Sequence, residues 1–152
     1  MPAVSTDRIE RQIHLRAPRT KVWKALTDLG QFQEWFGATL AGSFAPGKNA
    51  RGHVNAKGWE HVQIDIDVVK LDPEQYFAYR WRPFAVEAER DYSKEPKTLV
   101  EFTLDEVDGG TRVTVVESGF DKLMADRRDE AFRMHEGGWE GQLKNIAKYV
   151  AG

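Results

Sequence analysis

Residues 133–143 read RMHEGGWEGQL and lie within the longest amphipathic helix that the sequence predicts, from Ala125 to Val150. Apolar and aromatic side chains recur there at steps of three and four residues, which is the spacing of one buried helical face. The residues on this face are Phe132, His135, Trp139, Leu143, Ile146 and Val150. A single long helix with one buried face needs another element to cover it.

Three glycines, Gly137, Gly138 and Gly141, interrupt the same helix. Each glycine inside a helix costs about 0.8–1 kcal/mol relative to alanine. Two explanations are open: another backbone approaches the helix closely at these positions, or space is left open beside it. We therefore expect this helix to lie against something with little side-chain bulk on part of its face.

Length and composition limit the class of protein. A chain of 152 residues is expected to form a single domain, residues 1–152. Its composition, with 41% hydrophobic and 30% charged residues, is typical of a globular chain. The net charge of −2 argues against a nucleic-acid partner, which needs a basic face. No cysteine is present, so no disulfide, thiolate metal site or cysteine nucleophile is available.

The sequence also predicts no membrane span and a cytoplasmic location. No run of about 18 apolar residues occurs. Residues 1–8 contain no apolar stretch of the kind that a secretion signal needs.

Apolar and polar residues alternate in several segments before the long helix, which indicates strands with one buried face. The predicted strands cover residues 8–15, 38–45, 50–57, 62–68, 77–82, 100–104 and 113–117. Asp108-Gly109-Gly110 is a strong hairpin signal between the last two. Two short helices, near 18–27 and 31–36, follow the first strand.

Consecutive strands joined by hairpins form an antiparallel sheet, and the final helix is the only element long enough to cover it. The predicted fold class is therefore α+β. A curved antiparallel sheet of about six to seven strands wraps around one long C-terminal helix.

Short motifs in the same order resemble a known superfamily. They are Ala17-Pro18, Val22-Trp23, Leu26-Thr27, Trp35-Phe36, Glu117-Ser118-Gly119-Phe120, Gly137-Gly138-Trp139 and Leu143. Together they resemble the START-like (Bet v 1-like, SRPBCC) superfamily, in its Activator of Hsp90 ATPase homologue-like branch, over residues 8–150. The resemblance implies a helix-grip fold with a cavity between sheet and helix. It also implies an Hsp90-type chaperone as a candidate partner.

Two polar residues fall on faces that the patterns place inside. Glu117 shares a face with Val113 and Val115, and a buried carboxylate must be paired, hydrogen-bonded, protonated or in a wet cavity. A bulge near Gly119 that turns Glu117 outward is the alternative. His135 is either a core histidine bonded to backbone or a polar group in the cavity, where a Glu–His pair could act as an acid–base couple.

We expect the ligand-binding residues to be aromatic side chains of the sheet and short helices, together with the glycine-bearing part of the long helix. They are Trp35, Phe36, Trp59, Tyr79, Trp81, Phe102, Glu117, Met134, His135, Gly138 and Trp139. Plain core packing is the alternative for each aromatic residue. Arg80 and Arg82, and the charged run from Asp126 to Glu130, are expected to be solvent-exposed.

Searches for catalytic and metal-binding motifs find none. The four histidines, at 14, 53, 61 and 135, have no short paired spacing, and neither a GxSxG motif nor a phosphate-binding loop occurs. We therefore predict no metal, no cofactor and no catalytic residue.

Three functions remain as hypotheses. The first is a non-enzymatic binding protein for a small hydrophobic or amphipathic molecule. The second is a chaperone-associated interaction module, with the Trp23 region and the 83–97 connection as candidate surfaces. The third is a cyclase- or hydrolase-like enzyme that uses Glu117 and His135.

Overall fold

A computed structural model describes residues 8–82, 96–123 and 125–151 of the chain. The elements follow in the order β1 (Arg8–Leu15), α1 (Arg19–Thr27), α2 (Leu29–Phe36), β2 (Ala38–Gly42), β3 (Asn49–Val54), β4 (Gln63–Asp72), β5 (Tyr76–Trp81), β6 (Thr98–Val107), β7 (Gly110–Ser118), a 3₁₀ turn η1 (Phe120–Lys122) and α3 (Ala125–Ala151). The predicted α+β class and element order are confirmed.

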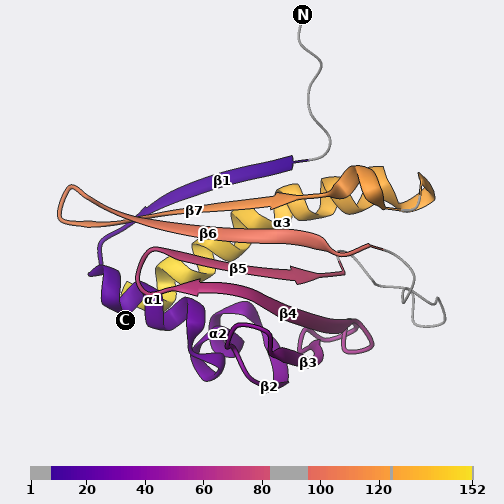
Figure 1. The fold of residues 1–152 in the computed structure, drawn as a ribbon, viewed down its shortest axis with the longest axis horizontal. Helices are drawn as coiled ribbons and strands as arrows, with labels where there is room; N and C mark the ends of the chain where they lie inside the picture. The colour runs from indigo at the N-terminus through magenta and orange to yellow at the C-terminus, as the bar shows by residue number, and fades with distance from the viewer. Residues whose placement is uncertain (1–7, 83–95, 124, 152) are drawn as a thin grey trace, which may run out of the picture.

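All the strands form one seven-stranded sheet in the order β1-β7-β6-β5-β4-β3-β2, and each neighbouring pair is antiparallel. In Figure 1, α3 runs diagonally across one face of this sheet. The two short helices α1 and α2 lie near the C-terminal end of α3. The first strand, β1, pairs with the last, β7, and is one edge strand of the sheet. The short β2 is the other edge strand.

The core lies between the sheet and α3, as the alternation predicted. The inward side chains of β5 (Phe77, Tyr79) and β6 (Val100, Phe102) are completely buried. They face the helical side chains Trp139, Leu143, Ile146 and Val150, which are also buried. The hairpin between β6 and β7 turns through Asp108 and Gly109, both at positive φ, which is the geometry of the tight turn that the sequence predicted.

Some predicted details are wrong. The strand expected at 38–45 ends at Gly42, because the chain turns through Gly47 (φ 78°), whose N–H donates to Val68 O. The strand expected at 50–57 begins at Asn49 and ends at Val54. The charged run 126–130 is not wholly exposed, because Arg127, in the first turn of α3, is buried. None of the helices in the described residues is long and apolar enough to cross a membrane.

Candidate functional site

Glu117 is a buried carboxylate at the centre of the site. It lies near the end of β7, opposite Ile9 of β1 and Val100 of β6, and its exposed fraction is 0%. The alternation that buries Val113 and Val115 turns Glu117 to the same inner face, so the alternative of an outward turn near Gly119 is wrong.

Four donors from four different side chains surround this carboxylate. Oε1 accepts from His135 Nδ1 at 2.5 Å and from the Trp139 indole at 2.8 Å. Oε2 accepts from Thr98 Oγ1 at 2.5 Å and from the Trp81 indole at 2.8 Å. The donors come from β5, β6 and α3, so one side chain of β7 holds three other elements together.

The donors keep the carboxylate ionised. Burial on its own raises the pKa of Glu117, but the charge of His135 and the hydrogen bonds from His135, Thr98 and Trp81 lower it by more. The pKa of Glu117 is therefore below its ordinary value. The neighbouring Tyr79 hydroxyl is buried and finds no hydrogen-bond partner among the described residues. Burial together with the charge of Glu117 raises its pKa well above the usual range.

His135 connects the buried carboxylate to the surface. Its side chain is 16% exposed while that of Glu117 is fully buried, so the imidazole lies on the outer side of the pair. The ring packs edge-on against Trp81 and Phe120, with centroids 5.7 and 5.9 Å away. A carboxylate that fixes one ring nitrogen holds the imidazole in a single orientation, which suits either ligand positioning or proton transfer.

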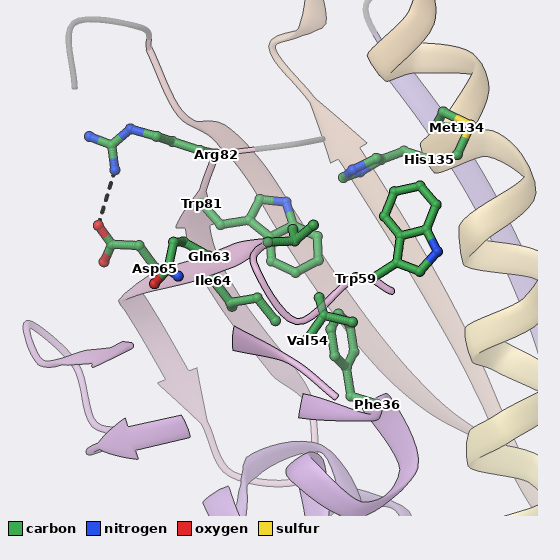
Figure 2. Close-up of a pocket in the computed structure, with 11 residues that line it drawn as sticks. Phe36, Val54, Trp59, Gln63, Ile64, Asp65, Trp81, Arg82, Met134 and His135 are labelled. Atoms are coloured by element: carbon green, nitrogen blue, oxygen red, sulfur yellow. Dashed lines mark hydrogen bonds and ion pairs between the residues drawn. The ribbon is translucent and has the colours of Figure 1, made fainter. Parts of the chain in front are cut away.

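A pocket of about 290 Å³ opens beside His135, and we call it the Trp59 pocket. Its walls are mainly apolar, and they come from the end of α2, the β3–β4 connection, the adjacent ends of β3, β4 and β5, and the N-terminal half of α3. The lining residues are Phe36, Val54, Trp59, Val62, Gln63, Ile64, Asp65, Trp81, Arg82, Met134 and His135. Figure 2 shows the Trp59 side chain reaching from the connection towards Met134 and His135 of α3.

The pocket lies at one end of the helix–sheet interface. The ends of β3 and β5 and the start of β4 meet there because neighbouring strands are antiparallel. Further along, the interface is filled by side chains: Phe102 packs edge-on against Trp139, and neither Tyr79 nor Phe102 reaches a pocket wall.

A second space of about 180 Å³ adjoins the Trp59 pocket, and we call it the Gly138 hollow. It is lined by Phe36, Trp81, Met134, His135, Gly138, Trp139 and Gln142. A Cβ added at Gly137, Gly138 or Gly141 would meet nothing within 4 Å. Close backbone approach is therefore the wrong explanation for these glycines. All three are exposed, so a side chain at any of them would extend into open space at the surface.

A network of ion pairs supports the outer rim of the Trp59 pocket. Asp65 Oδ2 accepts from Arg82 at 3.0 Å and lies 3.4 Å from Lys97 Nζ, while Asn49 donates to Oδ1 at 2.6 Å. Burial raises the pKa of Asp65, but Asn49, Lys97 and Arg51 together hold it below its usual value. The expectation that Arg82 is simply solvent-exposed is wrong, because this pairing draws it to the rim (Figure 2).

The structure distributes the predicted site residues over three places. The first group lines the pocket or the hollow and consists of Phe36, Trp59, Trp81, Met134, His135, Gly138 and Trp139. Glu117, which is buried behind them, accepts hydrogen bonds from Trp81, His135 and Trp139. Trp35, Tyr79 and Phe102 are buried elsewhere; the Trp35 indole donates to Ala25 O at 2.7 Å. Their role in binding a ligand stays a prediction.

Sequence reasoning missed several residues of the site. Thr98 could have been found, because it shares the inner face of β6 with Val100 and Phe102. Val54 and Gln142 carried no signal, since they join the site only through the path of the β3–β4 connection and the position of α3. Among the residues that the structure describes, no group of His, Asp and Glu side chains could hold a metal ion.

Comparisons with known proteins place this geometry in context. The sequence model of the family described as Activator of Hsp90 ATPase homolog 1-like protein matches residues 16–151. No curated protein sequence is significantly similar to the chain.

Solved structures share the fold at low sequence identity. Protein MLL2253 from Mesorhizobium loti is 21% identical with a TM-score of 0.75, and the match covers 95% of this chain and 96% of that one. The Aha1 dimer from Colwellia psychrerythraea is 19% identical with a TM-score of 0.70, covering 94% and 95%. DynU16, a putative protein in the dynemicin biosynthetic locus, is 23% identical with a TM-score of 0.72, covering 95% of this chain and 47% of that one.

Proposed function

Because this chain belongs to the family of Activator of Hsp90 ATPase homolog 1-like proteins, we propose that it binds a small apolar or amphipathic molecule in the Trp59 pocket. The fold of this family is generally of a ligand-binding type. The observation that carries the proposal is a mainly apolar pocket whose inner wall bears a histidine oriented by a buried carboxylate.

The chemistry of the walls supports an apolar ligand. Small-molecule sites are typically concave and mostly apolar with a few fixed polar groups, and about 290 Å³ is at the small end of their range. Trp59 and Met134, 47% and 48% exposed at the mouth, are two of the three large apolar side chains that are exposed among the described residues. A ligand that covered them would remove this apolar surface from water.

Naphthalene is a suitable test molecule, because it is flat, uncharged and small. In a titration followed by ¹H–¹⁵N NMR, the indole N–H signals of Trp59 and Trp81 should shift, and that of Trp23 on α1 should not. Shifts at Trp23 alone, or no shift at all up to the solubility limit, would contradict the proposal.

A chaperone partner is the second candidate, and the family match over residues 16–151 is what favours it. Of the two surfaces expected for such a partner, Trp23 is half-buried, and the 83–97 connection lies mostly outside the described residues. An ATPase assay of a purified bacterial Hsp90, with and without this chain, tests the idea. Unchanged ATPase activity at saturating concentrations would count against it.

The cyclase- or hydrolase-like alternative and the cytoplasmic location stay predictions. The contact between Glu117 and His135 is compatible with an acid–base couple, but the same contact is equally suited to holding a ligand.

A further inference from the structure

The Trp59 pocket and the Gly138 hollow form a two-lobed site. They share the four residues Phe36, Trp81, Met134 and His135, so a molecule in one space lies next to the other. The inference below rests on the proposed function, since it concerns the molecule that occupies this site.

Gly138 is an exposed residue of α3 that lines the hollow. A Cβ at this position would meet nothing within 4 Å, so no neighbouring atom requires glycine there. Alanine would be more favourable in the helix by about 1 kcal/mol. Gly137 and Gly141 have the same open surroundings but do not line the hollow, which makes them matched controls.

Gln142 supplies an amide to the wall of the hollow, beside the imidazole of His135. It lies one turn after Gly138 on α3, and its amide is fixed at both ends. Nε2 donates to Phe36 O at 3.1 Å, and Oε1 accepts from Asn145 Nδ2 at 3.0 Å. An amide offers two N–H donors and two lone pairs, so one donor and one acceptor position remain beyond these two bonds. A group that both accepts and donates, such as a hydroxyl or an amide, is complementary to that pair.

The charges around both lobes are balanced by partners. His135 lies against Glu117, and Arg82 lies against Asp65. A charged ligand would have to give up its hydration for groups that are already paired, which is costly. An uncharged ligand avoids this cost.

We infer that the ligand is a neutral amphipathic molecule with a flat apolar body in the Trp59 pocket and a short arm, ending in a hydroxyl or amide, that enters the Gly138 hollow and bonds Gln142. The apolar body accounts for the aromatic walls of the pocket, and the arm accounts for the hollow that Gly138 and Gln142 line beside it.

Three naphthalenes test the inference: naphthalene, 2-(2-naphthyl)ethanol and 2-propylnaphthalene. The last two differ only in whether the arm ends in a hydroxyl or in a methyl group of similar size. Dissociation constants from NMR titration of the wild-type chain should favour the ethanol arm over the propyl arm by roughly twofold to tenfold, the usual net contribution of one hydrogen bond. The side-chain amide signal of Gln142 should shift with the ethanol only.

Two variants locate the arm. Gly138→Leu fills the hollow and should abolish the preference for the ethanol. Gln142→Met should abolish the preference in the same way. Gly137→Leu places the same side chain one residue away from the hollow and should preserve it.

The outcomes separate the two proposals. Equal affinity of the two armed molecules for the wild-type chain overturns the inference, and so does loss of the preference in Gly137→Leu as fully as in Gly138→Leu. In both cases naphthalene binding still supports the proposed function. Failure of naphthalene and both derivatives to bind the wild-type chain contradicts the proposed function and the inference with it.

Discussion

The carboxylate of Glu117 on β7 lies 2.5 Å from His135 Nδ1 on α3, and no solvent reaches the carboxylate. This contact links the sheet to the helix at the point where the Trp59 pocket begins. Trp81, Thr98 and Trp139 complete the set of donors, so the group that supports the pocket is also a structural centre of the fold.

Replacing Glu117 with glutamine should destabilise the protein by about 3 kcal/mol, because the amide NH₂ would face donors and the buried charge of the pair would be left unbalanced. Urea unfolding followed by tryptophan fluorescence measures this change. Glu101→Gln is the control. Glu101 accepts a hydrogen bond from Tyr76 on the opposite face of β6, and this variant should lose less unfolding free energy than Glu117→Gln. Equal losses in the two variants would mean that the buried network has no special weight.

The stability contributed by Glu117 should depend on pH. Its pKa is lowered in the folded protein, so its stabilising effect is complete above the ordinary glutamate pKa of 4.5 and is lost as the pH falls through the lower, folded value. His135 and Tyr79 are the other titratable groups that face it, and Tyr79 stays neutral in this range. The difference in unfolding free energy between wild type and Glu117→Gln should therefore be largest at neutral pH and shrink below pH 4.5. A difference that grows on acidification would contradict the assigned charge state.

Trp59→Ala should weaken naphthalene binding by about tenfold, since an aromatic wall of the pocket is removed. Because Trp59 is 47% exposed, the free energy of unfolding should change by less than about 0.5 kcal/mol. Val69→Ala is the matched control, as Val69 is also 47% exposed but lies outside the pocket. If both variants bound naphthalene equally well, the molecule would occupy another place.

Gly137→Ala should stabilise the protein by up to about 1 kcal/mol, because its Cβ enters open space within a helix. Gly52→Ala should do the opposite and destabilise by more than about 2 kcal/mol, since its Cβ would lie 1.6 Å from Thr39 O on β2. Thermal unfolding of the two variants checks both signs. A destabilised Gly137→Ala would show that the helix is packed more tightly at this point than the described residues indicate.

Residue patterns were sufficient for the fold and for part of the site. The alternation in β7 placed Glu117 on the inner face, and the three- and four-residue spacing in α3 placed His135 on the buried side. Both inferences are local, since they depend only on which face of an element turns away from water. The family resemblance agreed with them and is confirmed by the match over residues 16–151.

By itself, the sequence determined the order of the elements, the antiparallel sheet covered by one long helix, and the inner faces that carry Glu117 and His135. Only the tertiary structure decided that these two residues meet and that the β3–β4 connection, with Trp59, closes a pocket beside them. It also decided that Asp65 draws Arg82 to the rim of this pocket and that the helix glycines face open space. The reason is that periodicity reports burial within one element, whereas a contact between elements depends on where the helix crosses the sheet and on the path of the connections.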